Sequence, residues 1–387
     1  MSIMGGGLHR MTMGKALKHA TVLFFVLIWS VPTLGLLISS VRDKDQLAIS
    51  GWWTSLSSKI SNDVVRMGSA DDQQQQGDHY IITGSVFEGN NKGTVLTFGF
   101  RSDELDAYKA GETADIGKGQ TLLVTAAGEY TLSSSEAFTS SRGKRLFFVA
   151  KHAPRFTFEN YHKVLTSEGI GRAFVNSATV TLPATFIPIL IAAFTAYALA
   201  WIDFKGRATM LALVVGLLVV PLQMSLIPVL RLYNEVGGYF GFPAKSYPGI
   251  WLAHTAFGLP LAIYLLRNYM AGLPKEIMES ARMDGASHFQ IFRTIVLPLS
   301  VPALASFAIF QFLWVWNDLL VSLVFLGIAD DKTVMTAQLK EMLGSRGNNW
   351  ELLTSGAFIT MIVPLIVFFS LQRFFVRGLL AGSVKGG

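Results

Sequence analysis

The sequence predicts an all-α polytopic membrane protein with six transmembrane helices and a small, mostly β domain inserted between helices one and two. Two observations support this fold class. Of the 387 residues 51% are hydrophobic and only 15% are charged, against roughly 25% charged residues in a soluble domain. The apolar residues also gather in charge-free runs of the ~20 residues that a helix needs to cross a bilayer. These runs are residues 20–41, 173–202, 208–230, 246–266, 294–317 and 352–372.

The runs are predicted to be helices because they lack the alternation of a barrel strand, and only helices or closed barrels satisfy their backbone in lipid. Arg10, Lys15 and Lys18 precede the first run, which raises the possibility of a signal peptide. The length of the run, its interruption at residues 32–35 and the absence of a clean small-residue cleavage site favour a retained span.

Lysine and arginine in the short loops predict the orientation. The N-terminal tail, the 203–207 turn, the 267–293 loop and the C-terminal tail together hold twelve basic and four acidic residues, whereas the two short loops on the other side hold five and six. Both termini and the 267–293 loop are therefore expected in the cytoplasm. The net charge of +6 follows from this bias and calls for no nucleic acid partner. The chain has no cysteine, which excludes disulfides and thiolate metal sites.

Residues 42–153 are predicted to form the extracytoplasmic, mostly β insertion. Residues 71–76 (DDQQQQ) are expected to be a disordered turn or linker, and residues 60–67 could be a helix or a strand. No residues show the spacing of a catalytic or metal site, so a docking or spacer role is favoured over an enzyme. An independent binding module stays possible. The strand candidates are residues 79–87, 94–100, 121–126, 129–133 and 146–150.

The polar gap between the fourth and fifth runs carries the most informative pattern. Glu279-x-Ala281 is followed after three residues by Gly285 and after nine more by Ile295-x-Leu297-Pro298. This pattern resembles the cytoplasmic coupling loop of the membrane subunits of binding-protein-dependent ABC importers, with Ser280 in place of the usual alanine. The resemblance implies that the loop is gripped by a partner ATPase.

Local chemistry predicts a helix, a sharp turn and a second helix in this loop. Pro274 is expected at the first helical position, and Gly285 is expected to end the helix in the left-handed conformation. Ser287 and Gln290 form the capping-box pattern that starts a second helix. Lys275, Glu279 and Arg282 have the spacing at which charges meet on one helix face. The predicted coupling residues are Glu279, Ala281, Arg282, Asp284, Gly285, Ile295, Leu297 and Pro298.

Two interpretations of the charged coupling residues are open. Glu279 and Asp284 are candidates for pairing with basic residues of the ATPase groove, and Arg282 for the converse, but each could instead be a solvated loop charge. Ala281 and Gly285 are small where close backbone approach is expected.

The resemblance continues along residues 154–387, which look like the smaller permease subunit of maltose-type carbohydrate importers. It implies a type I ABC importer core over residues 154–372 and a cytoplasmic tail at 373–387 that reaches the ATPases through Gln372, Gly378, Gly382 and Lys385. The insertion departs from the maltose type and is similar to the α-glucoside permeases. The implied location is the bacterial inner membrane.

The resemblance also implies the partners. The chain has no G-x-x-x-x-G-K-[ST] loop, so no phosphate-cradling motif is available for hydrolysing nucleotide. No cofactor is expected in this chain; ATP and Mg²⁺ would be bound by two partner ATPase subunits. The expected set is completed by a second permease subunit that forms a heterodimer with this chain, an extracytoplasmic solute-binding protein, membrane lipid and a sugar.

Residues for a sugar path are expected near the end of the fifth span, because sugars bind to aromatic faces and amide or carboxylate groups. Gln311, Trp314, Asn317 and Asp318 are the candidates. Trp314 could instead belong to the interfacial aromatic belt, and Asn317 and Asp318 could cap the helix; His254 is expected to be packed, with its ring nitrogens hydrogen-bonded. Two other functions stay open: import of a non-sugar solute such as glycerol phosphate, phosphate or polyamine, and a membrane-anchored sensor with a ligand-binding β domain.

Overall fold

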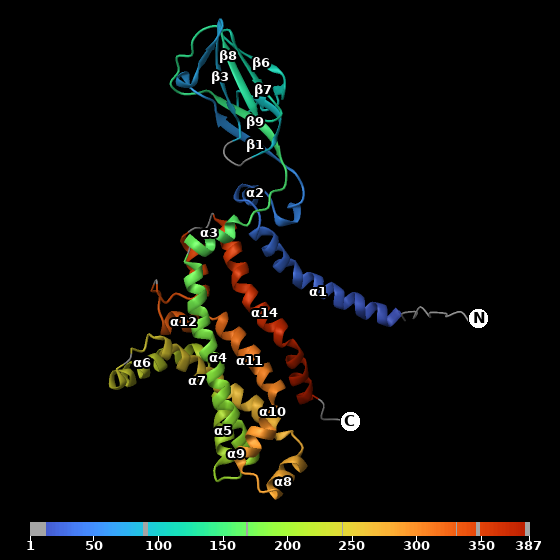
Figure 1. The fold of residues 1–387 in the computed structure, drawn as a ribbon, viewed down its shortest axis with the longest axis vertical. Helices are drawn as coiled ribbons and strands as arrows, with labels where there is room; N and C mark the ends of the chain where they lie inside the picture. Colours follow the sequence, from blue (N-terminus) through green and yellow to red (C-terminus); the bar gives the residue numbers. More distant parts are fainter. Residues whose placement is uncertain are drawn as a thin grey trace, which may run out of the picture. The chain divides into compact units, whose positions relative to one another are not determined.

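The computed structural model describes residues 13–87, 92–167, 169–241, 243–329, 331–345 and 349–383. The chain divides into two compact units (Figure 1). The helical unit combines Met1–Val41 with Phe158–Gly387, and the β unit comprises Arg42–Thr157, so it ends slightly beyond the boundary at 153 that the sequence predicted.

The β unit is built from two antiparallel sheets, with strand orders β1-β9-β4-β5 and β2-β3-β8-β7-β6. Side chains from both sheets, among them Phe98, Leu146, Ile82 and Leu122, share one buried core. Alternate residues of each strand face this core, as expected for half-buried strands. The strands are β1 (Lys59–Arg66), β2 (Gln74–Gln76), β3 (His79–Ser85), β4 (Thr94–Gly99), β5 (Tyr108–Lys109), β6 (Thr113–Gly117), β7 (Gln120–Val124), β8 (Glu129–Ser134) and β9 (Arg145–His152).

All five strands that the sequence predicted are present, and the ambiguous 60–67 segment is strand β1. The expectation of a disordered turn at 71–76 was wrong. Ser69 and Asp72 cap a short 3-10 turn at Ala70–Asp72, and Gln74–Gln76 pairs with β3. The Gln73 amide both donates to and accepts from the backbone of Phe138, at 3.3 and 2.8 Å. These side-chain bonds to the backbone order a polar tract that composition alone makes look disordered.

Hydrogen bonds join the segment that enters the β unit, residues 42–50, to the segment that leaves it, residues 153–155. The entering segment contains helix α2 (Lys44–Ile49). Arg42 donates to the Gln46 and Ser50 carbonyls at 2.9 Å each. Gln46 Nε2 donates to the Ala153 carbonyl at 2.8 Å, and the Arg155 N–H donates to Gln46 Oε1 at 3.1 Å. The entry and exit segments are therefore fastened to each other.

The helical unit is packed mainly around α4 and α7, with α11 against α4 and α14 against α11 (Figure 1). Its long helices are α1 (Met13–Ser40), α4 (Ile170–Trp201), α5 (Arg207–Leu217), α6 (Leu222–Phe240), α7 (Tyr247–Ala271), α11 (Val301–Trp316) and α14 (Trp350–Ser383). Its short helices are α3 (Glu159–Ser167), α8 (Lys275–Met283), α9 (His288–Ile291), the π-helical turn η3 (Phe292–Val296), α10 (Leu297–Leu299), α12 (Leu320–Phe325) and α13 (Met335–Ser345).

Among the described residues, four helices are long and apolar enough to cross a membrane by themselves, and six spans result if each of two bent helix pairs counts as one. The third predicted span, residues 208–230, is broken in the structure, because α5 and α6 meet at 108°. Pro221 lies at this break; it has no N–H to continue the α5 ladder and acts as the N-cap of α6.

The end of α1 is held by hydrogen bonds to two other helices of the helical unit. The Ser40 carbonyl accepts from Asn160 Nδ2 at 3.0 Å and from Ser355 Oγ at 2.9 Å, and the Ser40 hydroxyl lies 2.6 Å from the Tyr161 hydroxyl. Gly35 and Ser40 are the buried residues of α1. The helix is therefore anchored at one end and presents most of its apolar surface outward.

Candidate functional site

The predicted coupling loop forms a helical hairpin of α8 and α9. Its turn has the Schellman geometry, in which two N–H groups satisfy the last carbonyls of a helix. The Ala286 N–H donates to the Ala281 carbonyl and the Gly285 N–H to the Arg282 carbonyl, both at 3.0 Å. Gly285 has φ +80°, a conformation that favours glycine. The predicted helix stop at Gly285 is therefore confirmed.

The second helix of the hairpin starts with the predicted capping box. Gln290 N–H donates to Ser287 Oγ at 3.3 Å, and Ser287 N–H donates to Gln290 Oε1 at 2.7 Å. The first helix starts one position later than expected, because Pro274 is its N-cap rather than its first helical residue. Its extended ψ of 125° suits the residue that turns the chain into the helix.

The hairpin is fixed to the end of α4 by polar contacts. Arg282 Nη2 donates to the Trp201 carbonyl at 3.0 Å, where a guanidinium complements the negative end of the α4 dipole. Tyr197 Oη lies 3.1 Å from His288 Nδ1. The Trp201 indole N–H in turn donates to the Met270 carbonyl at 3.0 Å, which ties α4 to the end of α7.

Apolar packing adds to these bonds. Met278 of α8 is 2% exposed and lies in the same buried cluster as Ile291, Phe292 and Tyr197. The Phe292 ring packs against the rings of Phe194 and Tyr197, with centroids 4.8 and 5.3 Å apart. Both limbs of the hairpin are thus embedded in the α4–α7 core, so the hairpin and α4 can move as one body.

The predicted coupling residues divide into an inner and an outer set. Ala281, Ile295 and Leu297 pack against the buried cluster, whereas Glu279, Asp284 and Pro298 are exposed. Within the described chain neither Glu279 nor Asp284 has an ion-pair partner, so the expected pairing of Glu279 with Lys275 or Arg282 is absent. Arg282 is exposed and has no acidic ion-pair partner among the described residues; its guanidinium bonds to a backbone carbonyl instead.

The expectation of close packing at Gly285 is not met within this chain. A Cβ built on Gly285 meets nothing within 4 Å among the described residues, so its backbone conformation alone requires glycine. Sequence reasoning also missed Tyr197, Trp201 and Met278, which hold the hairpin. Tyr197 and Trp201 lie 91 and 81 positions from their partners, a separation at which no local pattern signals the contact.

The chain between the hairpin and α11 is bent. The residues of α9, η3 and α10 meet α11 at 69°. Ser300, at the bend, is buried and its hydroxyl has no hydrogen-bond partner among the described residues. A π-helical turn at Phe292–Val296 and the prolines Pro298 and Pro302 disrupt the regular ladder here, as kinks generally require.

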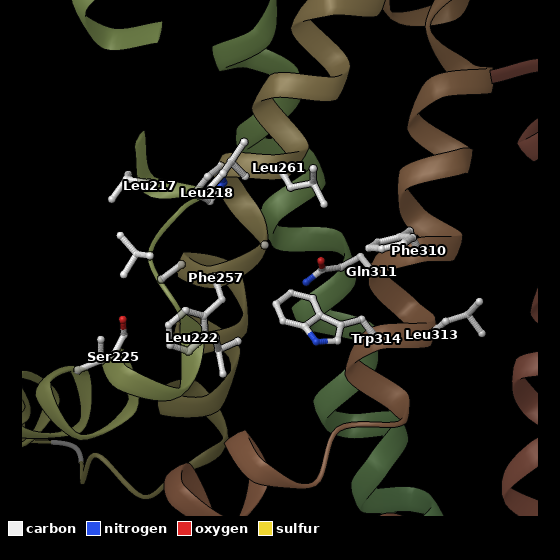
Figure 2. A pocket seen from close by; sticks show the side chains of 15 residues that line it. Leu217, Leu218, Leu222, Ser225, Phe257, Leu261, Phe310, Gln311, Leu313 and Trp314 are labelled. Carbon is white, nitrogen blue, oxygen red and sulfur yellow. The ribbon is translucent and has the colours of Figure 1, made fainter. Parts of the chain in front are cut away.

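A cavity of about 690 Å³ lies where the α5–α6 break, α7 and α11 face each other. Figure 2 shows Gln311 and Trp314 projecting from α11 toward Phe257 of α7 and Leu222 of α6. Gln311 is 1% exposed. Two of the four predicted sugar-path residues therefore line this cavity.

The other two predicted sugar-path residues act as helix caps, the alternative that the sequence left open. Asn317 Nδ2 donates to the Leu313 carbonyl at 2.8 Å. The Asp318 carboxylate accepts from the Val321 and Ser322 N–H groups at 3.3 and 3.0 Å, an N-capping arrangement for α12. Neither is among the residues that line the cavity. Asp318 Oδ2 also lies 3.9 Å from Nε2 of the buried His254.

Three of the four predicted tail residues lie inside the last part of α14. Gln372, Gly378 and Gly382 fall within this helix, and Lys385 lies outside the described residues.

The β unit carries a one-signed face on its first sheet. The register pairs Arg66 with Arg145, Val64 with Phe147, and Ile60 with Lys151, all pointing away from the core. At the end of this face, Phe100, Arg101, Asp103, Lys144 and Phe147 are among the residues that line a hollow of about 580 Å³. Asp103 pairs there with Arg101 at 3.0 Å. Burial, and secondarily the charge of Lys118, lower the pKa of Lys144. The outward positions of β1 and β9 thus combine apolar and basic residues without an acid.

Comparison with known proteins identifies the class of this helical bundle and hairpin. Residues 175–380 match the family described as binding-protein-dependent transport system inner membrane component, and the chain belongs to this family. It is the permease subunit of a binding-protein-dependent ABC importer of the inner membrane. The predicted family is therefore confirmed.

Three comparisons illustrate the relationship. The chain is 65% identical over 369 residues to the alpha-glucoside transport system permease protein AglG of Rhizobium meliloti (strain 1021), covering 95% of this chain and 97% of the relative. It is 56% identical over 273 residues to the osmoprotective compounds uptake permease protein GgtD of Synechocystis sp., covering 68% and 90%. A solved structure of a bacterial ABC transporter involved in alginate import is 23% identical, with coverage of 58% and 82% and a TM-score of 0.48.

Proposed function

We propose that this permease moves a sugar of the α-glucoside class into the cytoplasm. The observation that supports this substrate class is the 65% identity to AglG, which extends over 95% of the chain and so includes much of the β unit as well as the bundle. GgtD, whose name refers to osmoprotective compounds, matches 68% of the chain.

We also propose the complete assembly. This chain supplies six spans, counting each bent pair as one, and a second permease subunit supplies the other half of the pathway as a heterodimer. Two ATPase subunits bind ATP and Mg²⁺, and an extracytoplasmic binding protein delivers the sugar. The tail from Gln372 through Gly378, Gly382 and Lys385 reaches the ATPases. Both termini and the hairpin are cytoplasmic, in line with the basic bias of their loops.

The hairpin transmits the ATPase movement in this proposal. Exposed Glu279 and Asp284 offer carboxylates to basic groups of the ATPase groove, since unpaired surface acids are free to form such contacts. The exposed Arg282 and the buried Met278 fasten α8 to α4. A displacement of the ATPase would therefore move α4 and α7 together and switch the bundle between two packings.

The one-signed face of the β unit is proposed to dock the binding protein. Aromatic and arginine side chains are enriched in protein interfaces, and four basic residues at Arg66, Arg145, Lys151 and Lys144 favour an acidic partner surface. Docking here would keep the loaded binding protein attached to the permease on the extracytoplasmic side.

Reconstitution tests the substrate proposal. The complete complex in proteoliposomes should take up radiolabelled maltose, used as a neutral α-glucoside, only with internal ATP and external binding protein. Uptake of glycerol 3-phosphate or putrescine with no uptake of any sugar would contradict the proposal. Orientation is checked separately: a reporter active only outside the cytoplasm should work when fused after Gly77 and be silent after Ala286.

Replacement of the β unit tests the docking role. Residues 51–152 are the segment to exchange for a short Gly/Ser linker. This segment includes all of β9, which ends at His152, and keeps the hydrogen bond between Gln46 and Ala153. Assembly with the ATPases should be kept, while uptake at low binding-protein concentration should fall about fivefold, the loss expected for one modest interface. Unchanged uptake would contradict docking, and lost assembly would place the unit in the permease core.

A further inference from the structure

The cavity beside α11 contains an oriented and incompletely bonded amide. Gln311 Nε2 donates to the Ala184 carbonyl at 3.1 Å and lies 3.5 Å from the His254 carbonyl. Its other amide atom, Oε1, has no hydrogen-bond partner among the described residues. Because two backbone carbonyls fix the nitrogen, the acceptor oxygen is left for the cavity, toward which the side chain projects (Figure 2).

A glycine on the facing helix leaves room for this arrangement. A Cβ at Gly258 of α7 would lie 2.6 Å from Gln311 Oε1 and 2.7 Å from Nε2, which is closer than such atoms can approach. Any larger residue at 258 would displace the amide. The orientation of Gln311 thus depends on contacts from α4 and from two positions of α7.

The lining selects a class of ligand. It includes the aromatic side chains of Trp314, Phe257 and Phe310, and in the described part of the chain it contains no Asp, Glu, Lys, Arg or His. Aromatic rings pack on the C–H faces of sugar rings, and the buried amide oxygen accepts a hydroxyl hydrogen. A phosphate or an ammonium would require an opposite charge, so these walls suit a neutral, hydroxylated solute.

The size of the space agrees with this class. Its volume of about 690 Å³ lies within the roughly 300–1,000 Å³ of small-molecule sites. The amide oxygen is an acceptor without a protein partner among the described residues, so a donor that enters the cavity can bond to it. A passing sugar hydroxyl would be such a donor.

We propose that Gln311 and Trp314 form a subsite by which this permease subunit itself contacts a neutral sugar during transport, with Gln311 Oε1 accepting a hydroxyl hydrogen bond and Gly258 positioning the amide. The inference rests on the proposed sugar transport. It adds that this chain recognises the solute directly, rather than leaving recognition to the binding protein and the second permease.

The test uses the reconstituted complex with radiolabelled maltose and saturating binding protein, with uptake normalised to assembled complex. Gln311→Met keeps the length of the side chain but removes the acceptor, and should lower the uptake rate about tenfold. Gly258→Ala should give a loss of similar size by displacing the amide. Gly238→Ala is the matched control, because a Cβ there meets nothing within 4 Å; its uptake should equal that of the wild type.

Two further readouts separate the possible results. Basal ATPase activity should be unchanged in the Gly238→Ala control, and Trp314→Phe should keep more uptake than Trp314→Leu because it keeps an aromatic face. If both Gln311→Met and Gly258→Ala match the control, the cavity is filled by lipid or by the second permease, and the subsite is refuted. If Gln311→Met does not assemble, Gly258→Ala and the Trp314 pair decide by the same criteria. Absence of sugar uptake by the wild type would instead refute the proposed function.

Discussion

The hairpin at α8–α9 and the cavity beside α11 are built on opposite principles. In the hairpin, the helix ends are capped, the turn carbonyls are satisfied, and Arg282 and His288 bond to α4. In the neighbouring segments of α4 and α7, which do not themselves line the cavity, the hydroxyls of Thr181, Thr185 and Thr255 and both ring nitrogens of His254 are buried without a hydrogen-bond partner among the described residues.

This difference indicates that the hairpin transmits movement, whereas the α4 and α7 segments near the cavity change their contacts during transport. A fully bonded hairpin resists deformation, so force applied to it passes to α4 rather than being absorbed in the turn. Buried polar groups without partners are unfavourable in one packing of the bundle. They would be relieved in another packing of the bundle. Transport needs both properties.

The largest loss of uptake is expected from Gly285→Leu in the hairpin. Only the positive φ demands glycine here, so the variant strains the turn, and its side chain lies on the surface offered to the ATPase. Uptake should fall at least about tenfold with normal membrane insertion. Gly206→Leu is the matched control, since Gly206 has φ +90° and equally open surroundings but lies outside the motif. Equal losses in both variants would mean that strain alone, and not coupling, explains the effect.

A smaller effect is expected from the arginine contact. Arg282→Met removes the hydrogen bond to Trp201, so sugar-stimulated ATPase activity should be maintained while sugar moved per ATP falls about threefold. Arg207→Met is the control, because Arg207 donates to the Ala200 carbonyl of the same helix end at 3.1 Å without touching the hairpin. A larger loss in Arg207→Met would show that capping of α4 matters more than its tie to the hairpin.

The smallest effects should differ in sign between the regions. Ser287→Ala removes a helix cap and should destabilise the hairpin by about 1 kcal/mol, seen as faster hydrogen exchange at residues 288–291. Thr185→Val removes a buried hydroxyl that has no partner in the described chain, and should leave the melting temperature of the purified complex unchanged or slightly raised. A clear decrease for Thr185→Val would show that this hydroxyl is bonded in the assembled complex.

Sequence and structure agree best where local chemistry decides the conformation. The hairpin is predicted by Gly285, Ser287 and Gln290, because helix caps and turns depend on residues that are neighbours in the chain. The strands of the β unit were found for the same reason. The break between α5 and α6 was missed, since a proline within an apolar run is compatible with a continuous membrane helix.

Contacts between distant segments could not be predicted. Neither the bond of Arg282 to Trp201 nor the orientation of Gln311 by Ala184 and His254 leaves a pattern in a single sequence. Of the four residues proposed from chemical type near the end of the fifth span, Gln311 and Trp314 line the cavity and Asn317 and Asp318 cap helices. Residue type alone predicts all four candidates, and only the packing shows which two line the cavity.

The central claim is that the hairpin is where the ATPase engages this subunit. The chain has no cysteine, so a single Met283→Cys, at a side chain that is 88% exposed at the end of α8, can be cross-linked without further changes. The control is Tyr239→Cys, 91% exposed at the end of α6, expected on the opposite side of the membrane. In membranes containing the complete complex, a short bifunctional maleimide should join Met283→Cys to a single-cysteine ATPase subunit in an ATP-dependent amount and leave Tyr239→Cys unlinked. Cross-linking at Tyr239→Cys with none at Met283→Cys would contradict the account.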